Sequence, residues 1–297
     1  MKNIPLIVIV GQTGVGKSRL AIDLALKYGG EIISGDSLSL RKYMDIGTAK
    51  PSLEDRLRVR HHLIDIIDPD EKFSASQFKD LAEAKIEEIG SRGCIPVLAG
   101  GSGLYVDSVL YGYEFRPVAD PLYREMLESM DITDLLNLAA EKGLDIRQVD
   151  TKNKRRVVRY LETDGKRAAR KGLRDNTIVL GLDFDSEALK KSIEDRVDWM
   201  IANDLEGEVR WLAEKYGWGA EGLNAVGYKQ WKSYFEGTIG MPDVRANIIS
   251  ATNKLATKQR TWNRRNKDIT WLTKPINLTQ LHETITTKLS GLFPISH

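Results

Sequence analysis

The chain has 297 residues, of which 29% are charged and 41% hydrophobic, a composition typical of a globular protein with one large domain or two smaller ones. It contains no run of 18 apolar residues and no leader pattern at its start, so we expect neither a membrane span nor a signal peptide. The net charge is only +2, and a single cysteine with four histidines excludes internal disulfides, argues against structural zinc and favours a cytoplasmic location.

The first predicted element is a buried strand that leads into a phosphate-binding loop. Residues 6–10 form a continuous apolar run, and G-Q-T-G-V-G-K-S follows at 11–18, ahead of a helix expected at about 16–28. This is the Walker A pattern, G-x-x-x-x-G-K-S, between a strand and a helix. Its glycines let backbone N–H groups turn toward phosphate oxygens, Lys17 supplies a positive charge, and the Ser18 hydroxyl is suited to bind Mg²⁺. The sequence therefore predicts a site for a di- or triphosphate.

Three further strands are predicted at 31–34, 95–99 and 177–182. A capping box, S-A-S-Q at 74–77, opens a helix between the first two of these strands. Strands that alternate with helices predict an α/β fold with a P-loop NTPase-like parallel sheet flanked by helices.

Asp36 and Ser102 each lie just beyond the end of a predicted strand. Ligands of open α/β sheets bind at the carboxyl ends of the strands, so both side chains can converge on the phosphate-binding loop. Either residue can instead be a turn or cap residue, a position that short polar side chains favour.

Residues 116–171 contain no comparable strand and have a helical pattern, which predicts an α-helical insertion domain. We therefore expect three segments: a P-loop core at 1–115, the insertion at 116–172, and a return to the core at 173–297. The last segment contains helical patterns at 186–235 and a long helix at about 244–265.

Two segments concentrate positive charge. Residues 152–174 carry ten Lys or Arg and two acids, and residues 254–267 carry six basic residues and no acid. Because the whole chain is nearly neutral, the rest is acidic on balance. Such local clusters favour a polyanionic partner, although they are also compatible with two solvated helix faces.

Arg196 lies at the edge of an apolar helical stripe formed by Leu189, Ile193, Val197 and Met200. No carboxylate occurs three or four residues away on the same helix. A partly buried guanidinium requires an anion, so a carboxylate from elsewhere in the chain or a bound phosphate is expected beside it.

Four aromatic residues lie close to basic residues in the sequence: Tyr228, Trp231, Trp262 and Trp271. Aromatic rings of this kind are able to stack on unpaired bases. For Trp231 and Trp271 we expect instead a place in the core.

The motifs together resemble those of the tRNA dimethylallyltransferases, over nearly the whole chain. The matching stretches are 11–18, E-I-I-S-G-D-S at 31–37, M-D-I-G-T-A-K-P at 44–51, H-H-L-I-D at 61–65, D-P at 68–69, G-G-S-G-L-Y at 100–105, V-G-Y-K at 226–229, Gln259, and T-W at 261–262. The M-D-I-G-T-A-K-P segment is the most specific of these, since general P-loop kinases lack it. The absence of a zinc finger fits the bacterial type.

The resemblance implies transfer of a dimethylallyl group from dimethylallyl diphosphate to N6 of adenine 37 in the tRNA anticodon stem-loop, with Mg²⁺ as cofactor. It implies catalytic roles for Asp36 as the base, Ser102, and Arg196 as a diphosphate contact. The implied diphosphate-binding residues are Gly11, Thr13, Gly14, Val15, Gly16, Lys17 and Ser18, with Ser18 also the metal ligand. The implied tRNA-binding residues are Asp36, Ser37, Leu38, Ser39, Arg124, Arg155, Arg156, Arg159, Gly227, Tyr228, Lys229, Lys254 and Lys258.

Two sites depart from the pattern common in the family. Gln12 and Val15 stand where Pro and Ser are common, and Ser102 replaces Thr, which keeps the hydroxyl but loosens its rotamer. The alternatives are a kinase that uses the same loop with ATP and a P-loop RNA-binding protein without catalysis. Strand 95–99 lacks the Walker B aspartate of such kinases, which counts against the first alternative. The second gives Asp36 no function. We expect a monomer.

Overall fold

The computed structural model describes residues 4–115, 120–166, 168–273 and 275–289. The described chain divides into two compact units, one at Gly112–Gly172 and one formed by the segments on either side. The boundary predicted at residue 116 lies outside the described residues.

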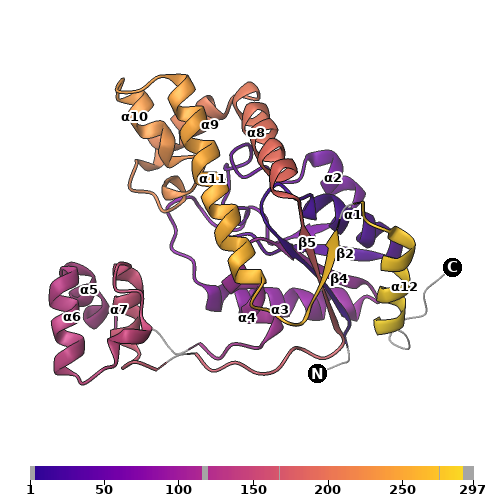
Figure 1. The fold of residues 1–297 in the computed structure, drawn as a ribbon, viewed down its shortest axis with the longest axis horizontal. Helices are drawn as coiled ribbons and strands as arrows, with labels where there is room; N and C mark the ends of the chain where they lie inside the picture. The colour runs from indigo at the N-terminus through magenta and orange to yellow at the C-terminus, as the bar shows by residue number, and fades with distance from the viewer. Residues whose placement is uncertain (1–3, 116–119, 167, 274, 290–297) are drawn as a thin grey trace. The chain divides into compact units, whose positions relative to one another are not determined.

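The larger unit is built on a parallel six-stranded sheet in the order β3-β2-β4-β1-β5-β6. Figure 1 shows helices packed around this sheet. The strands are β1 (Leu6–Gly11), β2 (Gly30–Ser34), β3 (His61–His62), β4 (Ile95–Gly100), β5 (Thr177–Asp183) and β6 (Ile269–Thr273). The helices of this unit are α1 (Lys17–Tyr28), α2 (Leu53–Arg58), α3 (Ala75–Ser91), α4 (Gly103–Leu110), α8 (Ser186–Ala202), α9 (Leu205–Tyr216), α10 (Lys232–Phe235), α11 (Met241–Asn263) and α12 (Leu278–Leu289). Short 3₁₀ turns at Gly222–Asn224 and Lys229–Trp231 precede α10. The predicted α/β fold with a parallel sheet is confirmed.

The phosphate-binding loop follows a central strand. β1 pairs with β4 on one side and with β5 on the other, with Ile7 opposite both Val97 and Ile178. All six residues of β1 are buried, because helices cover both faces of the sheet. This position places residues 11–18 at the carboxyl edge of the sheet, between the loops that follow β4 and β5 and one strand away from the loop that follows β2.

Two strands of the sheet, β3 and β6, have no counterpart in the sequence prediction. β3 has only two residues, both histidines, and β6 is an edge strand in which only Ile269 is buried while the other four residues are partly or fully exposed. Trp271 lies on β6 and its side chain is 36% exposed, so the prediction that it belongs to the core is wrong. Trp231 is fully buried, as predicted.

Helix ends follow local chemistry. The predicted capping box is confirmed at α3, where the Gln77 N–H donates to Ser74 Oγ at 3.3 Å and the Ser74 N–H donates to Gln77 Oε1 at 2.9 Å. Helix α11 begins three residues before the predicted start, because the Asp243 carboxylate accepts the Gly240 N–H at 3.1 Å and so caps the helix earlier.

The smaller unit, Gly112–Gly172, is helical in its described part. It contains α5 (Pro121–Ser129), α6 (Ile132–Glu141), a 3₁₀ turn at Ile146–Gln148 and α7 (Lys154–Glu162). These helices enclose a core of their own, formed by Leu127, Leu135, Ala139, Val157, Val158 and Leu161. An antiparallel bridge between Glu114 and Ala169 brings the two ends of the unit together.

None of the helices in the described part of the chain is both long enough and apolar enough to span a bilayer.

Candidate active site

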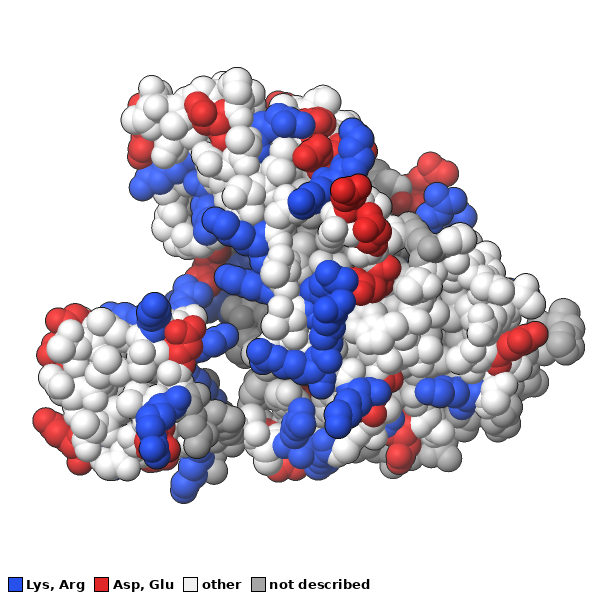
Figure 2. All heavy atoms as spheres, in the orientation of Figure 1, with Lys and Arg blue, Asp and Glu red and all other residues white. Residues whose placement is uncertain are grey.

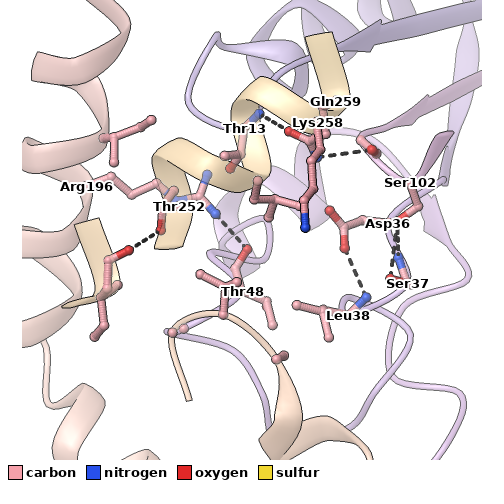
Figure 3. A pocket seen from close by; sticks show the side chains of 18 of the residues that line it. Thr13, Asp36, Ser37, Leu38, Thr48, Ser102, Arg196, Thr252, Lys258 and Gln259 are labelled. Carbon is pink, nitrogen blue, oxygen red and sulfur yellow. Dashed lines mark hydrogen bonds between the residues drawn. The ribbon is translucent and has the colours of Figure 1, made fainter. Parts of the chain in front are cut away.

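A cavity of about 520 Å³ lies at the carboxyl edge of the sheet (Figure 3). Three sheet loops reach it, one after each of β1, β2 and β4, and helices α8 and α11 line it from the other side. The lining residues are Thr13, Asp36, Ser37, Leu38, Gly47, Thr48, Gly101, Ser102, Gly103, Ile193, Arg196, Val197, Met200, Asn224, Ala225, Val226, Gly227, Ile248, Thr252, Leu255, Lys258, Gln259, Trp262 and Asn263. The three predicted catalytic residues, Asp36, Ser102 and Arg196, therefore line the same cavity.

The loop after β1 has the backbone conformation that its glycines permit. Gly14 and Gly16 have φ angles of +86° and +89°, which strain any residue with a Cβ. Val15, between them, is buried in the core, so only its main chain faces the loop interior. Helix α1 then begins at Lys17 without a side-chain cap, which leaves its first N–H groups to an external acceptor such as phosphate.

A second hollow of about 90 Å³ lies beside this loop. Lys17 and Ser18 line it, and it shares Thr13, Asp36 and Arg196 with the larger cavity. The predicted phosphate-binding side chains thus adjoin the predicted catalytic ones.

The charges in these hollows interact. Burial lowers the pKa of Lys17 to about 8, an effect that Asp36 opposes and Arg196 reinforces. The Lys17 ammonium donates to the Gln12 carbonyl at 2.7 Å. Burial also lowers the pKa of Arg196, again opposed by Asp36. Two cations outweigh one carboxylate here, so the hollows carry a net positive charge and favour an anionic ligand.

Asp36 is partly buried and its Oδ1 accepts the Leu38 N–H at 2.9 Å. The turn role considered from the sequence is therefore real, but it occupies only one carboxylate oxygen. The same carboxylate lines both hollows, so the turn bond orients Asp36 toward the ligand site without neutralising it.

Ser102 contacts the neighbour of Asp36 rather than Asp36 itself. Its hydroxyl accepts the Ser37 N–H at 3.0 Å and donates to Ser37 Oγ at 3.2 Å. The loop after β4 thereby holds the loop after β2, and Asp36 with it.

Arg196 projects from α8 and donates to the Thr48 carbonyl at 2.9 Å. Among the described residues, no carboxylate lies within ion-pairing distance of its guanidinium, so the protein supplies a neutral partner only. The sequence predicts either a carboxylate from elsewhere in the chain or a bound phosphate beside Arg196. This arrangement favours the bound phosphate.

Gln259, on α11, links two loops of the site. Its Oε1 accepts the Thr13 N–H at 2.7 Å and its Nε2 donates to the Gly101 carbonyl at 3.0 Å. A Cβ on Gly101 would lie 2.5 Å from Gln259 Nε2, so any larger residue there would push the Gln259 amide out of this position. Beyond membership of a motif, the sequence carries no signal for this role, because both partners are main-chain atoms in distant loops.

Trp262 packs against the Gly103 backbone, and its indole N–H donates to Asp107 Oδ2 at 2.8 Å. Its polar edge is therefore occupied by the protein. Lys258 and Lys254 are exposed on the same helix, and Figure 2 shows Lys and Arg side chains gathered along α11.

The remaining predicted tRNA contacts in this unit differ in exposure. Ser37, Leu38 and Gly227 line the larger cavity, and Lys229 is exposed. Ser39 is buried and lines the smaller hollow. Tyr228 is 0% exposed and donates to Glu208 at 2.8 Å, so its ring is a core side chain and cannot stack on a base.

In the unit Gly112–Gly172, the predicted tRNA-binding residues Arg124, Arg156 and Arg159 pair with acids. Arg124 and Arg159 both donate to Glu162, whose side chain is fully buried, and Arg124 also pairs with Glu128 at 2.8 Å. Arg156 lies 3.4 Å from Asp150. Arg155 is exposed. Arg167, which belongs to the same basic segment, lies outside the described residues.

Comparison with known proteins connects this site to a family. A family model described as IPP transferase matches residues 40–266. The chain is 37% identical to the tRNA dimethylallyltransferase of Bacillus subtilis over 304 residues, which cover 97% of each chain. Its structure is similar to that of the full-length tRNA isopentenylpyrophosphate transferase of Bacillus halodurans, with a TM-score of 0.75, 34% identity and 96% of each chain covered. It is also similar to the tRNA isopentenylpyrophosphate transferase of Staphylococcus epidermidis, with a TM-score of 0.72, 32% identity, and 96% of this chain and 98% of the other covered.

Proposed function

Because the chain belongs to the tRNA dimethylallyltransferase (IPP transferase) family, we propose that it transfers a dimethylallyl group from dimethylallyl diphosphate to N6 of adenine 37 in the anticodon loop of tRNA, releasing diphosphate. The observation that carries this proposal is the convergence of Asp36, Lys17 and Arg196 on adjoining hollows between the phosphate-binding loop and the basic helix α11.

Lys17, Arg196 and the N–H groups at the start of α1 are proposed to hold the diphosphate and to stabilise the charge that develops on it as it departs. A metal site made wholly by the protein does not fit, since no group of three His, Cys, Asp or Glu able to hold a metal occurs among the described residues. Mg²⁺ bound by the Ser18 hydroxyl, diphosphate oxygens and water does fit, because this ion usually keeps several waters. When bound, it would neutralise charge on the diphosphate.

The prenyl chain is proposed to lie against the apolar part of the larger cavity. Ile193, Val197 and Met200 from α8 and Ile248 from α11 line this part, next to Arg196. An apolar wall beside a cationic group matches a short hydrocarbon attached to a diphosphate better than it matches a nucleotide, whose sugar and base offer many polar atoms.

Asp36 is proposed to accept the proton of the attacking amine. The exocyclic amine of adenine is a poor nucleophile, since its lone pair is delocalised into the ring, and the base must leave the loop stack to reach the cavity. We propose that the insertion is a separate domain at 116–172, between the core segments 1–115 and 173–297. The RNA backbone would be contacted by its arginines and by Lys254 and Lys258 on α11. All these groups come from one chain, so a monomer is sufficient.

The experiment that tests the proposal measures binding and turnover with dimethylallyl diphosphate and tRNA, and binding with ATP, in the presence of Mg²⁺. We expect Lys17→Met to weaken donor binding by about 10- to 100-fold, the range of a hydrogen bond to a charged group. Donor affinity of the unaltered protein should fall as pH rises through about 8, because Lys17 loses its charge there and is fully charged only at lower pH. Lys17→Met should lose this pH dependence.

Lys27→Met is the matched control, since Lys27 is exposed at the other end of α1. Tight Mg²⁺-dependent binding of ATP without measurable affinity for the prenyl donor would contradict the proposal and favour a kinase.

The role of the insertion is tested by salt dependence. Arg155→Gln with Arg156→Gln should weaken tRNA binding and reduce the slope of log K against log salt, by about 0.9 for each duplex phosphate that the protein no longer neutralises. Donor affinity should be unchanged. Arg159 is left intact, because its removal would leave the buried Glu162 with one partner fewer.

Arg147→Gln, at an exposed arginine of the same unit, provides the control. An unchanged salt slope in the Arg155 and Arg156 variant would mean that this segment is only a solvated helix face.

A further inference from the structure

Glu208, on α9, accepts four hydrogen bonds with one carboxylate. Its Oε2 accepts the N–H groups of Asp45 and Ile46, both at 2.8 Å, and its Oε1 accepts the Gly47 N–H at 3.0 Å and the Tyr228 hydroxyl at 2.8 Å. Three consecutive main-chain donors directed at one anion form a strong, charge-assisted contact. The proposed reaction assigns no task to Glu208.

The segment that Glu208 holds is a tight turn at residues 44–50. The Thr48 hydroxyl donates back to the Met44 carbonyl at 2.6 Å, and Ala49 has a φ of +46°, which is unfavourable for a residue with a side chain. A Cβ on Gly47 would lie 2.6 Å from the Tyr228 ring, so the turn packs directly on the core side chain that Glu208 also contacts.

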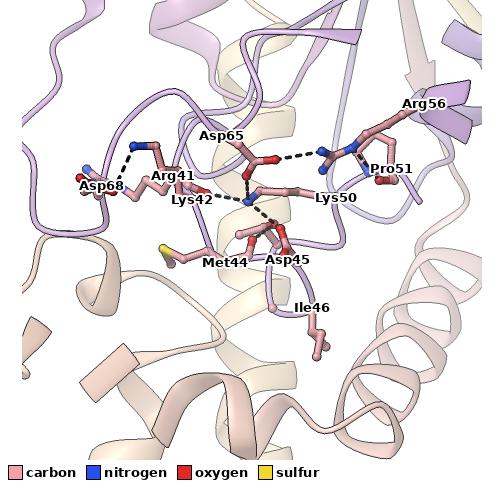
Figure 4. Close-up of polar contacts among 12 residues, drawn as sticks. Arg41, Lys42, Met44, Asp45, Ile46, Lys50, Pro51, Arg56, Asp65 and Asp68 are labelled. Atoms are coloured by element: carbon pink, nitrogen blue, oxygen red, sulfur yellow. Dashed lines mark hydrogen bonds and ion pairs between the residues drawn. The ribbon is translucent and has the colours of Figure 1, made fainter. Parts of the chain in front are cut away.

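The other side of the turn is fixed by Lys50 (Figure 4). Its side chain is only 1% exposed, and its ammonium donates to Asp65 at 2.6 Å, to Asp45 at 2.8 Å and to the Arg41 carbonyl at 2.6 Å. The turn is thus held at both ends by charged contacts, which leaves its backbone little freedom.

The turn directs the Thr48 carbonyl toward the cavity, where it accepts a hydrogen bond from the Arg196 guanidinium at 2.9 Å. Arg196 makes no ion pair with a described residue, so this carbonyl is the contact that sets the direction of its side chain. A displaced turn would therefore displace the guanidinium.

We propose that Glu208 is a positioning residue for the prenyl donor: by holding the N–H groups of residues 45–47, it fixes the Thr48 carbonyl, which aims Arg196 at the diphosphate. The inference rests on the proposed function, in which Arg196 contacts the diphosphate. It gives Glu208, which lies outside the motifs and on a different helix from Arg196, a role that acts only through Arg196.

The test is a double-mutant cycle of Glu208→Gln and Arg196→Ala, with donor affinity and single-turnover rate as readouts. The amide keeps one acceptor oxygen and turns N–H groups toward donors, so the turn loses part of its anchor. We expect Glu208→Gln to weaken donor affinity about tenfold, within the range of a hydrogen bond to a charged group. In the Arg196→Ala protein the same substitution should cost less than about twofold, since coupled residues are not additive. tRNA affinity should be unchanged.

Glu206→Gln is the matched control, because Glu206 lies on the same helix and pairs with Arg210 without contacting the turn. It should leave donor affinity unaltered. If Glu208→Gln does not fold, as judged by thermal melting, Glu208→Asp replaces it in the cycle. That variant retains the charge but draws the carboxylate back by one methylene, and it should show a smaller loss of affinity with the same dependence on Arg196.

Equal losses of affinity from Glu208→Gln in the presence and absence of Arg196, or no loss at all, would overturn the inference while leaving the proposed function intact. An Arg196→Ala protein with unaltered donor affinity would instead show that Arg196 does not hold the diphosphate before the reaction, which contradicts that part of the proposed function and the inference with it.

Discussion

Asp36→Asn is expected to slow the chemical step of prenyl transfer by about 10²- to 10⁴-fold, the usual effect of removing a general base. Asparagine keeps the shape of the side chain and an oxygen to accept the Leu38 N–H, so the turn after β2 should persist. The affinities for tRNA and donor should stay within a few fold. Single-turnover kinetics with saturating donor and tRNA measure the step directly.

Asp23→Asn, at an exposed carboxylate on α1, should be indistinguishable from the unaltered protein. An Asp36→Asn protein with a near-normal single-turnover rate would show that Asp36 serves only the turn. A collapse of both affinities together with the rate would point to disrupted structure rather than to a missing base, and thermal melting separates the two.

Arg196→Ala is expected to lower the single-turnover rate by about 10²- to 10³-fold, the effect of removing one group that stabilises transition-state charge. Unlike Asp36→Asn, it should also weaken donor binding, because the guanidinium contacts the diphosphate before the reaction as well as during it. The folded state should not suffer, since the substitution removes a bond to the neutral Thr48 carbonyl and leaves no described carboxylate unpaired.

Arg245→Ala on α11 serves as the comparison, because this exposed arginine pairs with Asp198 of α8 at the protein surface. It should leave rate and donor affinity unchanged. A rate for Arg196→Ala that falls without any weakening of donor affinity would mean that Arg196 acts in the transition state alone.

The sequence predicts the strands whose burial is continuous. β1 and β5 are apolar runs because helices cover both faces of the sheet there, and β4 reads almost as clearly. β3 and β6 carry no such pattern, because one is two residues long and the other is half exposed at the sheet edge. Short or edge strands depend on their neighbours for pairing, which a single sequence does not reveal.

The same distinction applies to the site. Asp36 and Ser102 are recognisable because they follow glycine-flanked strand ends, and Arg196 because no carboxylate on its own helix pairs with it. No comparable sequence pattern identifies Glu208 or Gln259 as a residue of the site. The contacts that matter for the site are made to main-chain atoms. These lie 161 to 163 positions from Glu208, and 158 and 246 positions from Gln259, and the main chain of any residue would serve equally well. Contacts of this kind follow from the fold and not from residue type.

Tyr228 illustrates the opposite error. An aromatic residue beside Lys229 fits a base-stacking surface on composition, but the packing of α9 and the turn at 44–50 encloses its ring. Burial depends on elements far away in the chain, so a local pattern of aromatic and basic residues does not distinguish a surface ring from a core ring.

The Gln259 amide fixes the distance between two loops by bonding to both of them. Its oxygen must face the Thr13 N–H and its nitrogen the Gly101 carbonyl, so the two ends of the amide are not interchangeable. Glutamate would offer no donor to the carbonyl, and asparagine would be one methylene too short to reach both loops from the same helical position. The width of the opening between the loops after β1 and β4 is thereby set by the covalent length of one side chain.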